Sequence, residues 1–137
     1  MSETHISDMK KDISHLEDIR LLVNEFYRKV QMNPLIGPIF IGVIQDRWPE
    51  HLEKMYRFWQ TVLLDENTYN GRPFPPHAQM PLDQKHFDVW LGLFLQTVDE
   101  NFDGTVADDA KMRAQNMASM FLNKIEHIRQ YPNQKTL

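Results

Sequence analysis

Apolar residues recur with helical spacing in four separate stretches of this sequence, and no stretch alternates with the two-residue period of a strand. This pattern predicts an all-α fold built from four main helices. The first stretch opens with a capping box at residues 14–17 and ends before Asn33-Pro34, because the residue before a proline avoids helical geometry. The second spans about residues 48–64 and carries Pro49 at an early helical position.

The two remaining helical stretches follow a long segment, residues 65–82, that contains four prolines and an Asn-Gly pair. Such a segment leaves no room for a long helix, is uncommon inside a compact domain and is typical of functional loops. His77 lies near its centre. The third stretch follows Asp83, a favourable N-cap, and the fourth opens at Thr105. Residues 35–41 are too short and broken for a long helix and predict a tight helical turn with a corner.

Length, charge and composition limit the classes of protein to which this chain can belong. A chain of 137 residues fits one domain, so we expect a single domain over residues 1–137 with a frayed start at 1–12. The absence of cysteine excludes disulfides, iron–sulfur clusters, thiolate zinc sites and a cysteine-ligated haem. Scattered basic residues and a net charge of -4 argue against nucleic-acid binding. No membrane span and no secretory signal is visible, so we expect a cytoplasmic protein.

Four polar-tipped residues are candidates for a functional site. Prolines on both sides of His77 restrict the backbone around it. This restriction suits a metal ligand that presents its ring nitrogen at a fixed angle. It suits a surface histidine in a stiff loop equally well. His51 points into the apolar stripe of the second stretch, either as a buried histidine with a hydrogen bond or as a polar group above a hydrophobic ligand. Tyr27 and Trp90 lie on apolar stripes, where core packing explains them as well as function does.

A zinc site formed by His51, His77 and His86 is a weaker alternative, because this spacing matches no known set of zinc ligands. Glycine-rich phosphate loops, nucleophile elbows and paired carboxylates in apolar settings are absent from the sequence.

Short motifs along most of the chain, from about residue 16 to 130, fall in the order and spacing of one known family. The sequence resembles the group III truncated haemoglobins, first in the loop that contains Asn70-Gly71-Arg72-Pro73, His77 and Met80-Pro81-Leu82. Six further motifs agree: residues 25–30, 37–40, Trp48 with His51, 58–59, 87–91 and 113–115. Each motif alone is weak, and six in register are strong. The implied fold is a 2-on-2 globin sandwich, two crossed antiparallel helix pairs with a long proximal loop.

The resemblance also implies roles for individual residues. His77 would be the proximal ligand and the sole protein bond to the iron, and the distal gas-binding residues would be Tyr27, His51 and Trp90. The implied cofactor-binding set is His77, Phe40, Met55, Trp59, Phe74 and Phe87. Arg72 and Tyr69 are candidates for contacting the haem propionates.

The function implied is reversible binding of O2, CO or NO at the pentacoordinate iron of haem b. Tyr27 would be the main hydrogen-bond donor to the gas, with His51 and Trp90 as helpers, and His51 could instead swing outward as a gate. Donors in a dry pocket slow gas release, so we expect oxygen, NO or peroxide chemistry, as an NO dioxygenase or a peroxidase-like enzyme, more than O2 delivery. We expect a monomer that works with a separate reductase. The alternative is a haem-free all-α sensor or interaction domain, with His77 on an ordinary loop.

Overall fold

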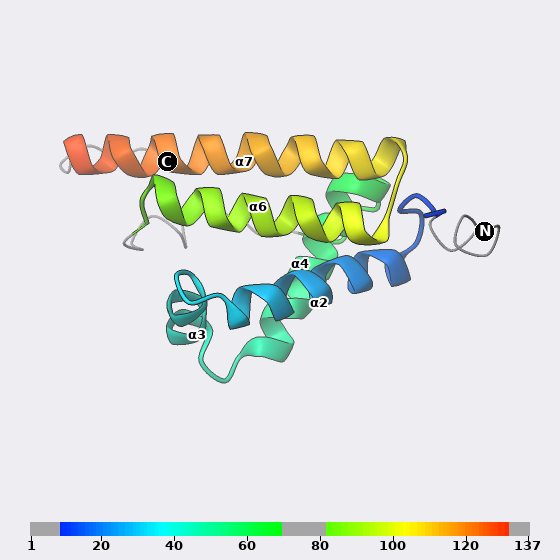
Figure 1. The fold of residues 1–137 in the computed structure, drawn as a ribbon, viewed down its shortest axis with the longest axis horizontal. Helices are drawn as coiled ribbons and strands as arrows, with labels where there is room; N and C mark the ends of the chain where they lie inside the picture. Colours follow the sequence, from blue (N-terminus) through cyan, green and yellow to red (C-terminus); the bar gives the residue numbers. More distant parts are fainter. Residues whose placement is uncertain (1–8, 70–81, 132–137) are drawn as a thin grey trace, which may run out of the picture.

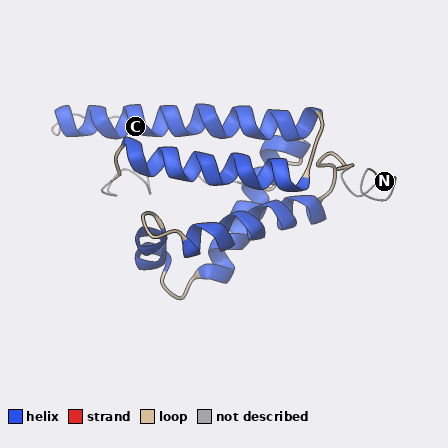
Figure 2. Ribbon diagram, in the orientation of Figure 1, coloured by secondary structure: helices blue, strands red, loops and turns tan. Residues whose placement is uncertain are grey.

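The periodic apolar stretches form helices. The computed structural model describes residues 9–69 and 82–131, and in those ranges every regular element is a helix (Figures 1 and 2). The helices are α2 (Leu16–Met32), α3 (Gly37–Ile44), α4 (Trp48–Leu64), α6 (Gln84–Asn101) and α7 (Thr105–Gln130). The all-α prediction is confirmed, and α3 is a short helix where we expected a turn with a corner.

The start of α2 lies slightly further along the chain than the predicted capping box. The N-cap is His15, and the carboxylate that returns to the backbone belongs to Asp18, not Glu17. Asp18 Oδ2 accepts hydrogen bonds from the backbone N–H groups of Ser14 at 2.9 Å and His15 at 3.2 Å. Lys11 Nζ also donates to this carboxylate, at 2.8 Å. Asp18 is buried and has these additional partners, so it takes the role that spacing alone assigned to Glu17.

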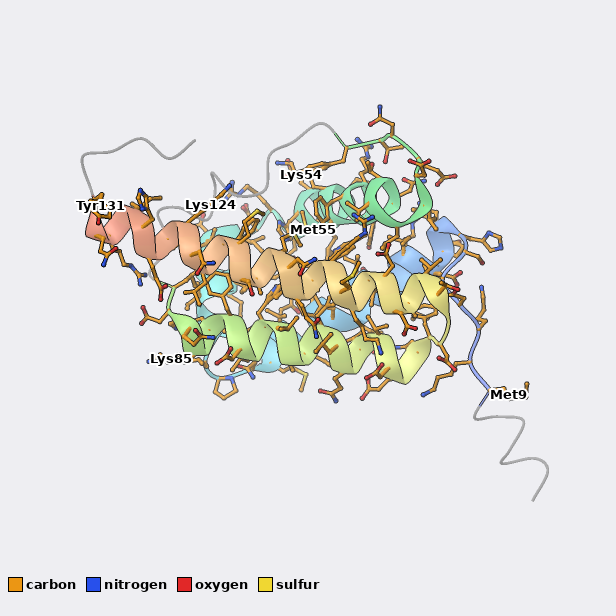
Figure 3. All side chains as sticks on the ribbon, turned by 90° about the horizontal axis from the view of Figure 1, so that it is seen from above. Met9, Lys54, Met55, Lys85, Lys124 and Tyr131 are labelled. Carbon is orange, nitrogen blue, oxygen red and sulfur yellow. The ribbon has the colours of Figure 1, made fainter. Side chains whose placement is uncertain are left out.

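Two helix pairs make up the molecule. Helices α6 and α7 run antiparallel and side by side, while α2 packs beneath α6 and is crossed by α4 (Figure 1). The short helix α3 lies beyond the carboxyl end of α2. The basic residues Lys54, Lys85 and Lys124 lie on three different helices (Figure 3), as their scatter in the sequence predicts.

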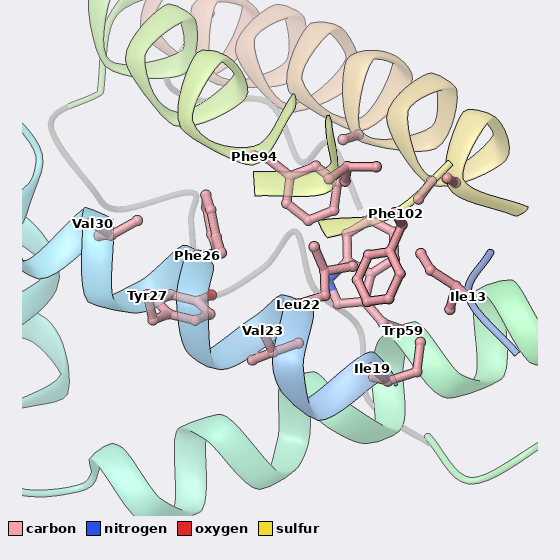
Figure 4. Packing of buried hydrophobic residues seen from close by; sticks show 14 of the residues in the cluster. Ile13, Ile19, Leu22, Val23, Phe26, Tyr27, Val30, Trp59, Phe94 and Phe102 are labelled. Carbon is pink, nitrogen blue, oxygen red and sulfur yellow. The ribbon is translucent and has the colours of Figure 1, made fainter. Parts of the chain in front are cut away.

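The buried apolar residues form two clusters. The main cluster lies between α2, α4, α6 and the first half of α7 (Figure 4). The second contains Leu82, Phe87, Ala118, Phe121, Leu122 and Ile125, from the start of α6 and the second half of α7. Trp90 and Met117 are partly buried and pack against both clusters. Across residues 9–69 and 82–131, no helix combines the length and the apolar character that crossing a bilayer would require.

The segment before α2 is bonded to the far end of the α6–α7 pair. Asp12 Oδ1 accepts from the backbone N–H of Ala107 at 2.8 Å, and Oδ2 accepts from Val106 at 3.0 Å. These are first-turn amides of α7, which have no partner within the helix. The N-cap itself, Gly104, has a φ of 143° and no side chain to offer. Residues 10–12, which we expected to fray, are therefore held in place, and Asp12 caps α7 from outside it.

Replacing Asp12 with alanine should lower the free energy of unfolding by about 1–2 kcal/mol, because the first turn of α7 loses its capping carboxylate. Burial alone would raise the pKa of Asp12, but backbone N–H donors outweigh it and hold that pKa below its ordinary value. The stabilisation is therefore fully present at neutral pH and disappears as the pH falls through the lowered pKa, below about 4. Urea unfolding of both proteins at pH 7 and pH 3 measures this. A difference of equal size at both values would contradict the assignment.

Gly37 and Gly42 form a matched pair of sites on α3. A Cβ at Gly37 would lie 2.8 Å from the backbone oxygen of Gln31 and 2.9 Å from that of Val30, whereas a Cβ at Gly42 meets nothing within 4 Å. Gly37→Ala should therefore cost about 1–3 kcal/mol, because backbone must shift. Gly42→Ala should stabilise the helix by about 0.5–1 kcal/mol. Thermal unfolding of the two variants checks both signs, and equal shifts in Tm would show that α3 does not pack closely on α2.

Candidate functional site

Tyr27 lies at the centre of a group of rings where α2, α3 and α4 meet. Its side chain is buried, and its ring centroid lies 5.1 Å from that of His51, 5.9 Å from Trp48 and 6.0 Å from Phe40. All three pairs are edge-to-face, the arrangement that the charge distribution of aromatic rings favours. The helical period of α2 turns Tyr27 toward α3 and α4, while its neighbour Phe26 faces α6. We call Tyr27, Phe40, Trp48 and His51 the Tyr27 cluster.

His51 is positioned by the start of α4. It lies one turn after Trp48-Pro49, and its half-buried ring stands nearly perpendicular to both Tyr27, at 86°, and Trp48, at 87°. The inward orientation predicted from the apolar stripe agrees with this placement. The sequence places Trp48 on the apolar stripe of this helix and in a family motif with His51, but we did not assign Trp48 to the site. Its three-residue separation from His51, which puts both residues on one helix face, was the available signal.

Burial controls the chemistry of the Tyr27 hydroxyl. Loss of contact with water raises the pKa of Tyr27 well above its ordinary value, because the phenolate would be poorly solvated there. The hydroxyl therefore keeps its proton across the physiological range. It can donate a hydrogen bond to a ligand, and it is not a nucleophile or a general base.

Trp90 reaches this group through a single intervening ring. Its indole lies 5.7 Å from Phe26, edge-on at 88°, and Phe26 in turn lies 4.9 Å from Tyr27. Trp90 also stacks on Phe94, with 5.9 Å between centroids and 8° between planes. The three predicted distal residues, Tyr27, His51 and Trp90, therefore belong to one continuous set of ring contacts, although Trp90 lies on the α6 side of α2.

The predicted cofactor-binding residues fall into separate places. Phe40 lies in the Tyr27 cluster. Trp59 is buried and stacks on Phe94 at 4.9 Å, and Met55 lies partly buried on the same helix, α4. Phe87 is part of the second buried cluster. His77 and Phe74 lie outside the described residues, as does Arg72.

The alternative histidine zinc site finds no support in the described part of the chain. No group of three or more His, Cys, Asp or Glu residues is arranged there to hold a metal ion. His86 Nδ1 accepts a hydrogen bond from the backbone N–H of Asp83 at 2.9 Å, at the start of α6. His86 thus has a structural role that explains its position without a metal.

Helix α4 has an apolar face that the rest of the described chain covers only in part. Trp59 is the one buried residue of the helix. The other apolar residues packed against the core from this face are partly exposed, namely Trp48, Leu52, Met55, Phe58, Val62 and Leu63. A helix of this composition normally buries such a stripe completely. The ring of Tyr27 contacts α4 through Trp48 and His51.

Comparison with known proteins agrees with this geometry. The family model of the bacterial-like globins matches residues 11–124. The group 3 truncated hemoglobin ctb of Campylobacter jejuni is 36% identical over 121 residues, which cover 85% of this chain and 95% of the relative. The group 1 truncated hemoglobin GlbN of a Nostoc species is 28% identical over 123 residues, 87% of this chain and 100% of the relative.

A solved structure supports the same relationship. The crystal structure of the group III truncated hemoglobin from Campylobacter jejuni superposes with a TM-score of 0.78 at 35% identity, covering 85% of this chain and 95% of that one. The two crossed helix pairs are therefore the truncated-globin arrangement that the motifs predicted. The chain belongs to the bacterial-like globin family and, within it, to the group III truncated haemoglobins.

Proposed function

We propose that this protein binds haem b and uses it to hold O2, CO or NO, with the Tyr27 cluster on the side where the gas sits. Haem, when bound, supplies an iron with a coordination position open to a diatomic gas. The observation that carries the proposal is a buried, protonated phenol beside an imidazole of α4, a helix whose apolar face is partly uncovered.

The apolar face of α4 fits the body of a haem. A porphyrin is a flat apolar plate, and most of its binding free energy comes from removing apolar surface from water. Met55 and Leu52 are partly exposed in the structure and would lose that exposure against such a plate. At roughly 25 cal/mol for each Å² of apolar surface buried, covering such side chains is favourable.

The division of the core into two clusters also fits a flat ligand. The main cluster and the second cluster meet at Trp90 and Met117, both of which are only partly buried. Both side chains keep some exposed surface that a bound ligand would cover. Large apolar side chains at the boundary between two clusters are suited to contact with a planar apolar group.

Tyr27 would act as the main donor to the gas. Bound O2 carries partial negative charge, and a hydrogen bond in a water-poor site stabilises that charge more than one in water. Burial raises the pKa of Tyr27, so its hydroxyl keeps the proton that it would donate to the gas at neutral pH. His51 and Trp90 would add to the polarity of the site, with His51 held at 5.1 Å from the Tyr27 ring.

His77 is our proposed iron ligand. The support is its place in the sequence: it lies between prolines and ahead of Leu82, where the described chain enters the second buried cluster. Arg129 donates to the backbone oxygen of Leu82 at 2.5 Å and to Asp83 Oδ1 at 2.8 Å. Leu82 and Asp83 are thus bonded to α7.

A protein whose hydrogen-bond donors slow the release of the gas is a poor gas carrier. Each net hydrogen bond contributes about 1 kcal/mol, so two donors would slow release by an order of magnitude or more. We therefore propose that the bound gas is consumed in oxygen, NO or peroxide chemistry, with electrons from a separate reductase.

Tyr27→Phe should raise the O2 dissociation rate of the haem-loaded protein by about fivefold or more, since about 1 kcal/mol of stabilisation is lost. Stopped-flow displacement of O2 by CO measures this rate. Tyr56→Phe is the matched control, because Tyr56 lies on α4 and its hydroxyl donates to Asn24 at 2.5 Å, away from the cluster. An unchanged rate in Tyr27→Phe would remove Tyr27 from the role of donor.

His77→Ala should abolish or displace the Soret band of the purified protein, because the iron loses its protein ligand. His86→Gln is the control, and it should leave the band in place, since His86 caps α6. Visible spectra after titration with hemin give the answer. Wild-type protein that takes up no hemin would favour a haem-free sensor or interaction domain instead.

A further inference from the structure

Five aromatic rings form a continuous chain from the distal side of the core to the surface. Trp90 stacks on Phe94 at 5.9 Å and 8°, and Phe94 stacks on Trp59 at 4.9 Å and 20°. Trp59 then lies 5.2 Å from Phe58, and Phe58 lies 5.3 Å from Tyr69. Figure 4 shows Phe94 and Trp59 close together in the core. We call these five residues the ring chain.

The composition of the ring chain alternates between two kinds of side chain. Trp90, Trp59 and Tyr69 carry indole or phenol groups, which can lose one electron to a strong oxidant. The phenyl rings of Phe94 and Phe58 are not oxidised by such an oxidant. They occupy the space between the oxidisable rings. The protein has no cysteine, so thiols are unavailable as electron donors. Indole and phenol are therefore its most readily oxidised side chains, together with methionine.

The two ends of the ring chain differ in their surroundings. At the inner end, Trp90 contacts Phe26, and Phe26 contacts Tyr27 of the Tyr27 cluster. At the outer end, Tyr69 is only half-buried, so its phenol can release a proton to water. Its backbone N–H donates to Thr61 Oγ1 at 3.0 Å, which fixes the residue against α4. Partial burial raises the pKa of Tyr69, so it starts as a neutral phenol.

We propose that the ring chain carries single electrons inward, from Tyr69 at the surface to Trp90 in the core. Tyr69 is then the site at which phenol-type reductants are oxidised. The proposal rests on the proposed function, because the oxidant is a hydroperoxide reduced at the haem. Each electron that leaves Tyr69 is accompanied by loss of its phenolic proton to water. An external phenol then restores Tyr69 by giving up one hydrogen atom.

The overall reaction is balanced by two such steps. The hydroperoxide takes up two electrons and two protons and becomes an alcohol and water, or two waters when it is hydrogen peroxide, while two phenols each lose one hydrogen atom. Core packing by itself accounts for the burial of Phe94 and Trp59. It does not require that oxidisable rings alternate along the chain or that the last one opens to solvent.

The test is the position of the protein radical. Haem-loaded protein is treated with hydrogen peroxide in the presence of a nitroso spin trap, and the labelled residue is located by peptide mass spectrometry. We expect the adduct on Tyr69 in the wild type and its loss in Tyr69→Phe. Trp59→Phe keeps a ring in the stack but removes the oxidisable indole, and it should lower labelling of Tyr69 by an order of magnitude. Phe58→Leu, which interrupts the chain nearer the surface, should also lower it.

The matched control is Tyr56→Phe, which removes another α4 tyrosine whose hydroxyl is bonded to Asn24. It should leave the labelling of Tyr69 unchanged. Labelling is expressed per haem bound, which the Soret absorbance of each variant gives, because Trp59 and Tyr69 are themselves candidates for contact with haem. Equal labelling of Tyr56, Tyr69 and Tyr131, or labelling of Tyr69 that survives both Trp59→Phe and Phe58→Leu, would overturn the proposal.

A second measurement separates this proposal from the proposed function. In protein without haem, azide radicals generated by pulse radiolysis oxidise indoles selectively, and the conversion of an indolyl to a tyrosyl radical is followed by absorbance. The wild type should show the conversion, and Tyr69→Phe should lose most of its amplitude. If hemin is not taken up, the proposed function fails while this result still tests the ring chain. An equal amplitude in both proteins would refute electron transfer along it.

Discussion

Phe26 and Tyr27 are neighbours on α2 and contact different helices. Phe26 contacts Trp90 and Phe94 of α6, whereas Tyr27 contacts Trp48 and His51 of α4 and Phe40 of α3. Successive helical residues point about 100° apart, so α2 can pack against both α4 and α6 only if its buried stripe is wide. It is wide, with both large rings fully packed. The Tyr27 cluster and the ring chain each depend on this position of α2 between α4 and α6.

The partly covered apolar face of α4 lowers the stability of the folded state. Apolar side chains left in contact with water forfeit stabilisation that a complete core would supply. Trp59, stacked on Phe94, is the point where α4 is firmly packed, and the side chains nearer its start are less buried. A ligand that covers that face would stabilise the folded state by mass action. Binding of such a ligand would then be coupled to folding through the side chains of this face.

Helical periodicity predicted which way the side chains of Tyr27 and His51 face, whereas their distal role is implied by the resemblance to the family. The apolar stripe of α4 predicted that His51 faces inward, and the stripe of α2 placed Tyr27 at its edge, because side chains three or four apart share a helix face. The same reasoning did not identify Trp48 as a neighbour of Tyr27, since contacts between helices depend on how they cross. Tyr69 gave no periodic signal at all. Its contact with Phe58 arises because the chain after α4 folds back onto that helix.

Helix capping shows which helix ends can be predicted from neighbouring residues and which cannot. The carboxyl end of α2, the start of α4 and the N-cap of α6 follow from Pro34, Pro49 and Asp83, whose effects act on adjacent residues. The cap of α7 is Asp12, more than ninety residues earlier in the chain, and no local pattern connects the two. The four long helices, their inward faces and the family could be predicted from short-range spacing along the chain. Which rings meet, and which carboxylate caps which helix, could not be predicted in this way, because those contacts join residues far apart in the chain.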